Sequence, residues 1–359
     1  MTDLSWVLLL GAVTASIAHI FAGYWGDRWL ARFGSRRGLI GVGLFALCGS
    51  YLWLAAAADV TTIVVAVVVY QIALNLFFAP LGALLVDYVP DERKGTVAGW
   101  LNAALPLASI FTAIIARLYP VDDFAGFLVV AAAVIACAAP LLILWPNHLQ
   151  PLAVTDRSEA PPSRQVWSDF LIAWCARFLI QFGAAIVLGY LFAYLSLSMD
   201  IPDFPVNASA GVATLALVAA AAGFASAVGA GRLSDGTFGR LAPMTTGALC
   251  VAISFATLAL TESWLIFVAA YAVCQIGLAC FVTVDSALVA QLLHGHGRRG
   301  MWLGVMNLTN TLPGVFGPVL TLTVVSALSD RGTISALFLL SAVAALFASV
   351  IIQRIRSVR

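Results

Sequence analysis

The chain has 359 residues, of which 62% are hydrophobic and only 10% are charged. Soluble domains contain ~25% charged residues, so the 18 basic and 17 acidic side chains cannot cover the surface of a soluble fold of this length. The composition excludes a soluble enzyme, a disordered chain and a nucleic-acid-binding protein, and it predicts an all-α polytopic membrane protein in a lipid bilayer.

Apolar runs of membrane-spanning length alternate along the chain with charged residues, prolines and glycines. We expect eleven helices, over 5–25, 38–58, 61–86, 95–118, 124–145, 168–198, 208–232, 241–260, 263–292, 299–327 and 333–355. The segment 146–167 differs from its surroundings because it contains four prolines and several charged residues. It predicts a linker between an N-terminal half, 1–145, with five helices and a C-terminal half, 168–359, with six.

Basic residues are concentrated in alternate loops. All of the 18 lysines and arginines lie there except Arg117, Arg177 and Arg331, while the intervening loops contain acids such as Asp59 and Asp330. Because loops rich in Lys and Arg stay on the cytoplasmic side, this pattern predicts a cytoplasmic linker and C-terminus. We expect a multi-pass protein of the cell's inner membrane.

The two halves repeat one another in sequence. Three sets of residues recur after 204 to 208 positions, as a fixed period predicts for pseudo-repeated halves of a transporter. The pairs are Gly23/Gly231, Asp27/Asp235, Gln71/Gln275, Ile72/Ile276, Gly95/Gly300, Gly99/Gly304 and Asn102/Asn307. The helix at 168–198 has no counterpart in the first half, so we infer that the first helix of a six-plus-six arrangement is absent from this chain.

Residues 23–28, Gly-Tyr-Trp-Gly-Asp-Arg, and 32–37, Arg-Phe-Gly-Ser-Arg-Arg, carry a resemblance to a known family. They resemble the signature loop of the major facilitator superfamily, and a degenerate copy follows at 231–240. The longer form of the loop is most similar to that of the glycoside-cation symporters and sucrose-type transporters. The resemblance implies a monomeric secondary transporter that takes up a small polar solute, such as a sugar or glycoside, by alternating access with a proton or sodium ion.

The resemblance also implies that this loop is a conformational latch on the cytoplasmic side. Asp27 is predicted at a helix C-terminus, where an acid opposes the helix dipole, so its partners are expected at a neighbouring helix N-terminus or among nearby arginines. The alternative is a basic loop that sets topology, with Asp27 as a helix cap. The second copy has Gly236 where the first has Arg28. The latch candidates are Gly23, Asp27, Arg28, Arg36, Arg37, Asp235 and Arg240.

Charged residues inside apolar helices are costly unless they are paired or solvated, so they are candidates for substrate or ion binding. Asp285 is the candidate for proton or sodium coupling, and a structural pair with an arginine is the alternative. Arg177, with Gln181 one turn later on the same face, is expected to hold Asp285 or a substrate group. The alternative for Arg177 is an extended side chain that reaches the membrane surface. His19 is either a proton or sugar ligand or a packed histidine.

Amide side chains form stripes at helical spacing on three predicted helices. They predict a cavity that offers hydrogen bonds to a hydroxyl-rich solute, or, alternatively, polar contacts that hold helices together. The amides are Gln71, Asn75, Asn102, Asn307 and Asn310. The glycine pairs at 95/99 and 300/304 are assigned to close helix packing.

No metal site, cofactor or enzyme motif is expected. His294 and His296 lie in a short loop without a third ligand, and the six cysteines lack a metal-ligand spacing. Two other functions stay open. The chain could export amphipathic compounds, although the predicted helix 95–118 lacks the antiporter signature of drug exporters. It could also be a non-transporting relative that acts as an assembly factor or a sensor.

Overall fold

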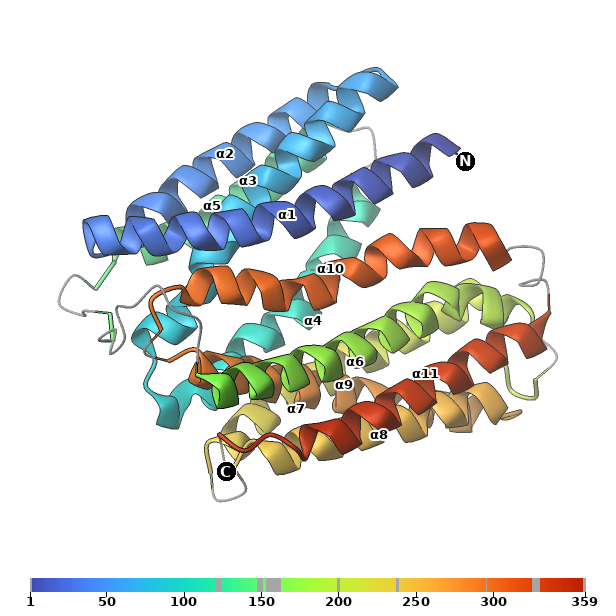
Figure 1. The fold of residues 1–359 in the computed structure, drawn as a ribbon. Helices are drawn as coiled ribbons and strands as arrows, with labels where there is room; N and C mark the ends of the chain where they lie inside the picture. Colours follow the sequence, from blue (N-terminus) through green and yellow to red (C-terminus); the bar gives the residue numbers. More distant parts are fainter. Residues whose placement is uncertain are drawn as a thin grey trace. The chain divides into compact units, whose positions relative to one another are not determined.

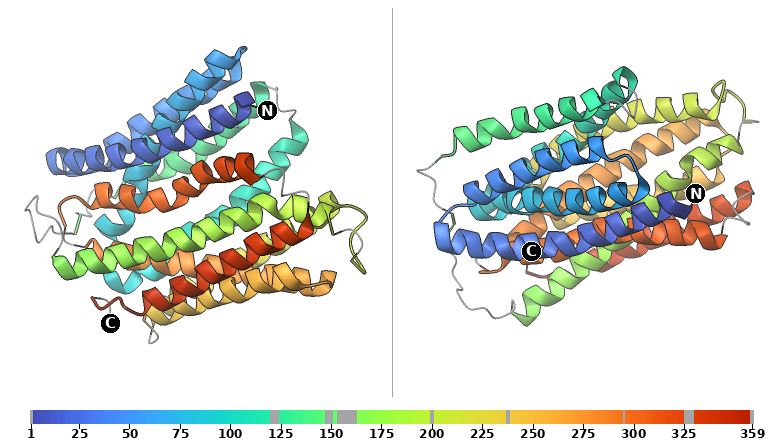
Figure 2. Two further views of the ribbon diagram at one scale, coloured as in Figure 1. Left: turned by 45° about the vertical axis from the view of Figure 1, so that its right-hand side comes forward. Right: turned by 90° about the horizontal axis from the view of Figure 1, so that it is seen from above.

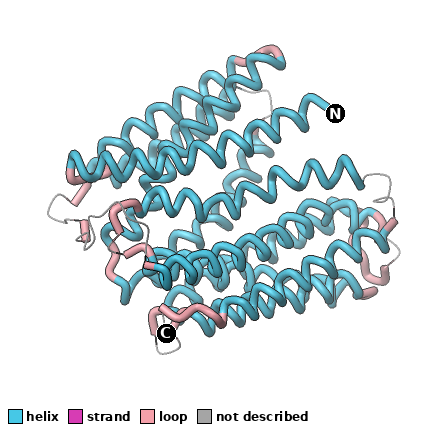
Figure 3. The backbone as a smooth tube through the Cα atoms, viewed as in Figure 1, coloured by secondary structure: helices cyan, strands magenta, loops and turns pink. Residues whose placement is uncertain are grey.

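The computed structural model describes residues 2–119, 124–146, 151–152, 163–198, 201–236, 239–294, 296–324 and 330–357. Over these residues the chain forms eleven α-helices and a short 3-10 turn, η1 (Asp91–Arg93), without a strand (Figures 1 and 3). The helices are α1 (Thr2–Phe33), α2 (Arg37–Ala56), α3 (Val60–Tyr88), α4 (Lys94–Leu118), α5 (Phe124–Ile143), α6 (Arg164–Ser196), α7 (Ala208–Ser234), α8 (Leu241–Leu260), α9 (Trp264–Leu292), α10 (Arg299–Val324) and α11 (Arg331–Ile352).

The predicted all-helical class and the eleven helices are confirmed. Ten of the helices in the described part are long and apolar enough to cross a membrane. Large apolar side chains lie on their outer faces, such as Phe45 at 84% and Leu265 at 76% exposure. Such exposure suits a lipid-facing surface, whereas in water it would drive aggregation. Most of the predicted linker, residues 147–150 and 153–162, lies outside the described residues.

The end of α1 differs from the prediction. The helix continues past residue 25 to Phe33, so Asp27 lies inside α1 and its predicted place at the helix C-terminus was wrong. The helix ends at Gly34, whose φ of 69° is left-handed, a conformation that strains most residues and that glycine adopts freely. The start of α6 also differs, because Arg164 lies within the predicted linker. There the Ser163 hydroxyl accepts the Val166 N–H and caps the helix.

The chain divides into two units. Unit 1 comprises 1–90, 111–160 and 293–315, and unit 2 comprises 91–110, 161–292 and 316–359. Helices α4 and α10 are therefore each shared between the units. Unit 1 includes part of α10 from the predicted C-terminal half, and unit 2 includes part of α4 from the predicted N-terminal half. The two-half division at the linker stays a prediction, because it describes the sequence repeat and these units group residues by packing.

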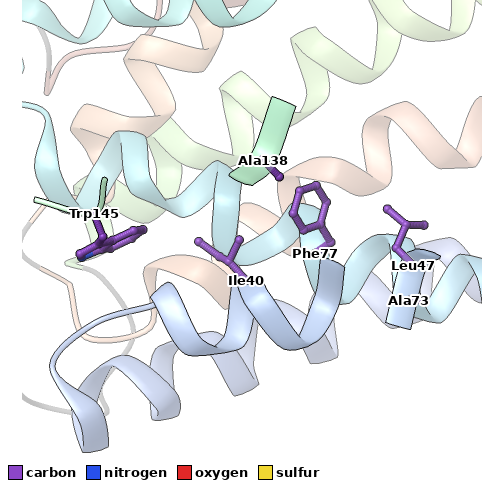
Figure 4. Packing of buried hydrophobic residues seen from close by; sticks show 6 residues of the cluster. All are labelled: Ile40, Leu47, Ala73, Phe77, Ala138 and Trp145. Carbon is purple, nitrogen blue, oxygen red and sulfur yellow. The ribbon is translucent and has the colours of Figure 1, made fainter. Parts of the chain in front are cut away.

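Unit 1 is built around α2, which packs against α3 and α5, while α1 packs against α3 (Figure 2). Aliphatic and aromatic side chains from α2, α3, α5 and the residues just after α5 pack together in one cluster (Figure 4). The buried members are Ile40, Leu47, Ala73, Phe77, Ala138 and Trp145. Gly43 lets α2 approach α3 closely, because a Cβ at this position would lie 2.7 Å from the Cα of Phe77.

Unit 2 packs α8 between α9 and α11, with α7 on α9 and α6 on α11. Its core contains fully buried aromatic rings, among which Tyr194 stacks on Phe267 with ring centroids 5.8 Å apart. The guanidinium of Arg331 lies 5.4 Å from the centre of the Tyr194 ring. Arg331 is thus one of the three basic residues outside the basic loops, and here it covers the aromatic core.

Acidic and amide residues of the intervening loops cap helices. Asp59 accepts the Thr62 N–H at 3.0 Å, Asn207 accepts the Ala210 N–H and Asp330 accepts the Thr333 N–H. Hydrogen bonds from the Thr62 hydroxyl and N–H lower the pKa of Asp59. These residues therefore satisfy N–H groups that have no partner inside their own helices.

The approach of α2 to α3 predicts a sharp difference between two glycines of α2. Gly43→Ala should lower the free energy of unfolding by about 1–3 kcal/mol, because the added Cβ collides with backbone that cannot move freely. Gly41→Ala, where a Cβ meets nothing within 4 Å, should leave stability unchanged or raise it slightly. Thermal unfolding of the purified variants measures both. Equal midpoints for the two variants would contradict the packing described for Gly43.

Candidate functional site

Asp27 binds the start of another helix in unit 1. Its Oδ1 accepts the Gly300 N–H at 2.9 Å and its Oδ2 accepts the Met301 N–H at 3.0 Å. These N–H groups open α10 and have no acceptor within that helix, and the positive end of the helix dipole favours an anion there. Arg36 donates from Nη2 to Asp27 at 2.8 Å. Both kinds of partner expected for Asp27, a helix N-terminus and an arginine, are present.

Two glycines of α1 make room for these contacts. A Cβ on Gly23 would overlap the carbonyl oxygen of Gly300, so a side chain here would push α10 away. A Cβ on Gly26 would lie 2.6 Å from Nη1 of Arg36. In the sequence Gly23-x-x-Gly26-Asp27, Gly23 allows backbone contact with α10 and Gly26 leaves space for the Arg36 guanidinium. Asp27 supplies the carboxylate that binds both α10 and Arg36.

Arg36 is the centre of a buried network, here named the first charged cluster: Asp27, Arg36, Asp87 and Arg299. Arg36 Nε donates to Asp87 at 2.5 Å, and Arg299 Nη1 lies 3.4 Å from the same carboxylate. All four side chains are nearly inaccessible to solvent, and two acids balance two bases. Burial by itself would lower the pKa of Arg36, but Asp87 and Asp27 outweigh it and raise that pKa above its ordinary value.

The described part of the linker docks on the first charged cluster. The Leu152 N–H donates to the Asp87 carbonyl at 2.6 Å, and Arg299 Nη2 donates to the Leu152 carbonyl at 3.1 Å. Just before the linker, Trp145 meets Tyr88 edge to face, with ring centroids 6.0 Å apart. The cluster therefore joins the end of α3, the start of α10 and the chain that leaves α5.

Unit 2 contains a matching arrangement around Asp235. Its Oδ1 accepts the Gly95 N–H at 2.7 Å and its Oδ2 accepts the Thr96 N–H at 2.6 Å, at the start of α4. Here Gly231 lies against the Gly95 carbonyl, and a Cβ on Gly99 would lie 2.7 Å from the Ala227 carbonyl oxygen. The close packing predicted for the glycine pairs is confirmed. The second copy thus binds a helix N-terminus although Gly236 replaces its arginine.

The basic residues around Asp235 have fewer carboxylate partners than those of the first charged cluster. Arg240 lies 3.9 Å from Asp235 and donates instead to the Ala287 carbonyl at 2.7 Å and to Gln291 Oε1 at 2.6 Å. Burial lowers the pKa of Arg240, and Asp235 offsets this only in part. Lys94 is buried and pairs with Asp91 at 2.5 Å. We name Asp91, Lys94, Asp235, Arg240 and Gln291 the second charged cluster.

Four residues of the two clusters were not among the predicted latch candidates: Asp87, Arg299, Lys94 and Gln291. The repeat contains the signal, because Asp87 corresponds to Gln291 and Lys94 to Arg299 at the same offsets of 204 and 205. Two predicted candidates lie outside the first cluster. Arg28 is exposed with its guanidinium 5.0 Å from the Tyr24 ring centre, and Arg37 is exposed with its N–H bonded to Ser35.

Arg177 and Asp285 form an ion pair in unit 2, between α6 and α9. Arg177 Nη1 donates to Asp285 Oδ2 at 2.7 Å. The Asp285 side chain is fully buried, while the Arg177 side chain is 11% exposed. Of the alternatives predicted for Arg177, the structure therefore shows the ion pair with Asp285. Gln181 lies one helical turn further along α6.

A neutral polar group lies in unit 1 among α1, α3 and α10. His19 Nδ1 lies 2.6 Å from Asn75 Oδ1, which places the ring proton on Nδ1 because a carbonyl oxygen only accepts. One turn earlier, the Ser16 hydroxyl donates to Thr311 Oγ1 at 2.7 Å. Asn75 Nδ2 donates to the Gln71 carbonyl. The structure thus brings together four polar side chains, two of which, His19 and Asn75, were predicted.

The remaining amides bond within their own helices. Asn310 Nδ2 donates to Asn307 Oδ1 at 2.9 Å in unit 1, and Asn102 Nδ2 donates to the Ala98 carbonyl in unit 2. Asn310 is exposed, and Asn102 and Asn307 are half-buried. These amides therefore keep surface that a solute can reach, and they lie in two different units.

The family model of the Major Facilitator Superfamily matches the chain twice, over residues 1–235 and 186–358. Together the two matches cover nearly the whole chain, and they overlap in its middle. The chain belongs to the Major Facilitator Superfamily. It is therefore a multi-pass membrane protein and a secondary transporter of small molecules, and it is not an enzyme. No curated protein sequence matches the chain significantly.

Solved structures of transporters share the fold at low sequence identity. A bacterial homologue of the iron transporter ferroportin, in its outward-facing state, superposes with a TM-score of 0.75 at 17% identity, over 98% of this chain and 90% of that one. The human organic anion transporter TETRAN has a TM-score of 0.70 at 17% identity, over 94% of this chain and 83% of that one. The proton:xylose symporter XylE has a TM-score of 0.71 at 14% identity, over 97% of this chain and 86% of that one. At these identities the likeness shows the fold alone.

The first charged cluster predicts that two neighbouring arginines differ in their contribution to stability. Arg36→Gln should lower the free energy of unfolding by about 3–5 kcal/mol, because Asp27 and Asp87 stay buried without their main partner. Arg37→Gln removes the same charge from an exposed side chain and should change stability by less than about 0.5 kcal/mol. Thermal unfolding compares the two. The double variant Arg36→Gln/Asp87→Asn should recover part of the loss, and no recovery would contradict the pairing.

Proposed function

We propose that the chain takes up a small polar solute by alternating access, driven by a proton or sodium gradient. The observation that carries the alternating-access part is the pair of matched carboxylate contacts, from Asp27 to the start of α10 and from Asp235 to the start of α4. In terms of the predicted halves, 1–145 and 168–359, each contact joins a helix of one half to a helix of the other.

These contacts have the strength that a reversible latch needs. A hydrogen bond to a charged group contributes about 1.5–3 kcal/mol, so each aspartate with two N–H donors contributes a few kcal/mol. A two-state equilibrium is biased strongly by differences of this size and can still be reversed by a ligand. The predicted orientation places both contacts on the cytoplasmic side of the inner membrane. They support a conformation that is latched there and a latch role for Gly23, Asp27, Arg36, Asp235 and Arg240.

Asp285 is the proposed coupling residue. Its carboxylate is fully buried in α9, with Arg177 as its partner 2.7 Å away. Ionisable residues in membrane-spanning helices are costly to keep and commonly belong to ion or substrate pathways. Because loading and unloading an ion changes the charge that Arg177 faces, occupancy at Asp285 can bias the two conformations differently.

The neutral polar group of unit 1 supports a solute with hydroxyl groups. His19, Asn75, Ser16 and Thr311 offer both donors and acceptors, which hydroxyls satisfy in either direction. A sugar or glycoside has this chemistry, in agreement with the resemblance of the loop at 23–37 to that of glycoside-cation symporters. We propose a monomer as the transporting species.

One other proposal remains for the substrate and direction of transport. Export of amphipathic compounds would need a cavity of apolar and aromatic side chains, and the hydrogen-bonding group around His19 and Asn75 favours a polar solute instead. Membership of a transporter family disfavours the other alternative, a non-transporting assembly factor or sensor. Such a role also does not need a coupling residue, whereas the chain has the buried ion pair of Asp285 with Arg177.

The coupling role predicts the behaviour of Asp285→Asn in proteoliposomes. With an inward proton or sodium gradient and a labelled panel of sugars, glycosides and small carboxylates, this variant should lose gradient-driven accumulation at least ~10-fold. It should keep solute exchange, because binding at equal concentrations needs no driving ion. Asp203→Asn, which removes an exposed loop carboxylate whose left-handed φ of 61° suits asparagine, is the matched control. Unchanged accumulation in Asp285→Asn would refute the coupling role.

The latch predicts that its two contacts open together. Asp27→Asn should speed amide hydrogen exchange at Gly300 and Met301 by roughly 10-fold, as expected when about 1.4 kcal/mol of hydrogen bonding is lost. It should also speed exchange at Gly95 and Thr96, which do not touch Asp27, because rocking of the halves releases both helix starts. Asp59→Asn should affect neither site. Faster exchange at Gly300 and Met301 alone would indicate local fraying in place of a latch.

A further inference from the structure

Helix α1 continues beyond the residues that the proposed latch uses. After Asp27 it runs on through Arg-Trp-Leu-Ala-Arg-Phe, residues 28–33, and ends at the left-handed Gly34. The repeat-related helix of unit 2, α7, ends at Ser234, one residue before Asp235. Asp235 nevertheless binds the start of α4 with both carboxylate oxygens. The extension of α1 is therefore not required for a contact of this kind.

One face of the extended end of α1 is exposed, aromatic and basic. Phe21, Trp25 and Phe33 are 66%, 62% and 56% exposed. Two exposed arginines, Arg28 and Arg32, follow Trp25 by three and seven residues, a spacing that places all three on one face of a helix. Phe21 lies on the same face one turn earlier, and Phe33 borders it. The extension thus presents apolar rings and positive charge together.

The arginines of this surface lie against aromatic rings and not against acids. The guanidinium of Arg28 is 5.0 Å from the centre of the Tyr24 ring, and that of Arg32 is 5.4 Å from the centre of the Phe33 ring. Arg37, at the start of α2, is exposed too. Within the described part of the chain, none of the three arginines forms an ion pair with an acid. A ring beside a guanidinium orients it and leaves N–H groups available to an anion.

The turn between α1 and α2 gives this surface a fixed shape (Figure 1). Trp29 packs against Gly38 of α2, where a Cβ would lie 3.1 Å from the indole ring. The ring centroids of Trp29 and Phe33 are 4.5 Å apart. The Ser35 hydroxyl accepts the Arg37 N–H at 3.1 Å. A preformed surface of this kind loses less conformational entropy on binding than a flexible basic loop would.

The length of α1 places this end in the headgroup region of a bilayer. A helix rises ~1.5 Å per residue, so the 32 residues of α1 extend over ~48 Å. The hydrocarbon core is ~30 Å thick, and the bilayer with its headgroups measures ~40–45 Å. The apolar run at 4–22 is long enough to fill the core. The turns that follow it therefore lie at the level of the lipid phosphates, where aromatic rings and arginines are both stable.

A partner for this surface must supply negative charge and an apolar region together. A soluble anion would leave the exposed rings in water, and hydrocarbon alone would leave the arginines without a counter-charge. A lipid with a net negative headgroup provides both. We propose that the end of α1 and the start of α2 form a binding site for one anionic phospholipid, such as phosphatidylglycerol.

In this site the phosphate of the lipid contacts Arg28, Arg32 and Arg37. The rings of Trp25 and Phe33 lie against its glycerol backbone and the first carbons of its acyl chains. The site gives Arg28 and Arg37 a role that the first charged cluster does not, because both lie outside that cluster. The inference does not depend on which solute the chain transports.

Other exposed arginines of the chain supply a matched control. Arg232, near the end of α7, and Arg354, after α11, are exposed and belong to basic loops on the same predicted side of the membrane. Neither lies over an aromatic ring among the described residues. They carry the same charge without the aromatic part of the proposed site.

Lipid binding to the full chain tests the proposal. The chain is purified in detergent, delipidated and titrated with phosphatidylglycerol or phosphatidylcholine of identical acyl chains, and bound lipids are counted by native mass spectrometry. We expect one phosphatidylglycerol to bind at least ~10-fold more tightly than phosphatidylcholine, with an affinity that falls as salt is raised. Equal affinities for the two lipids overturn the inference.

Paired variants locate the site. Arg28→Gln/Arg32→Gln should weaken phosphatidylglycerol binding roughly 25-fold, because a basic residue near anionic lipid contributes about fivefold. Arg232→Gln/Arg354→Gln removes the same charge and should change the affinity by less than ~2-fold, since those arginines lie outside the site. Thermal unfolding and size-exclusion profiles confirm that both variants fold. Equal losses in the two variants would indicate a general charge effect and overturn the inference.

Two further measurements distinguish a lipid from a free anion. Trp25→Ser/Phe33→Ser keeps every arginine and should still weaken phosphatidylglycerol binding at least ~10-fold, because the rings no longer cover apolar parts of the lipid. Millimolar inorganic phosphate or glycerol 3-phosphate should not displace the bound lipid. Unchanged binding in the aromatic variant, or displacement of the lipid by either phosphate, would indicate a site for free anions and overturn the inference.

Discussion

The structure depends on carboxylates held against the first N–H groups of a helix. The opening turn of a helix has donors without acceptors, and in a membrane protein water is not always there to bind them. Asp27 and Asp235 each accept two such donors. To reach them, the backbones must approach to near contact, which is why glycines occur at 23 and 231 and opposite them at 300 and 95. One interaction thus accounts for the glycines, the acids and their spacing.

The surroundings of the two aspartates follow from the cost of burying charge. In the first cluster, Arg36 is buried between two carboxylates and Arg299 completes a neutral set of four. In the second, Gln291 occupies the position where the repeat would place an acid. Arg240 therefore donates to the Ala287 carbonyl and to Gln291 Oε1, and Lys94 pairs with Asp91 of the adjacent turn. Neutrality is kept in both, but by residues at different positions. The constraint that persists across the repeat is charge balance, and the individual side chains vary.

The helices and the partners of Asp27 could be predicted from sequence, whereas the end of α1 and the role of Asp87 could not, each for a physical reason. Long apolar runs determine the number of helices. The partners expected for Asp27, a helix N-terminus or an arginine, are both present, although the helix C-terminus assumed at Asp27 was wrong. The predicted end of α1 was wrong because a segment with two glycines and several charged residues resembles a loop. In the structure this segment is helical, and Gly300 and Arg36 pack against it. Asp87 was missed because it ends an apolar run, where its role depends on Arg36, 51 positions earlier.

The strong and the weak contacts of the proposed latch lie at different places. The short ion pairs of Arg36, at 2.5 Å to Asp87 and 2.8 Å to Asp27, lie within the predicted N-terminal half and need not break when α10 moves away. The contacts that would break at the start of α10 include the N–H hydrogen bonds to Asp27 and longer contacts of Arg299, 3.4 Å from Asp87 and 3.5 Å from the Val86 carbonyl. Water can replace these at modest cost, whereas separating Arg36 from both acids would leave buried charges unpaired. A fixed ionic scaffold that presents a replaceable set of hydrogen bonds is therefore consistent with repeated cycling between two conformations.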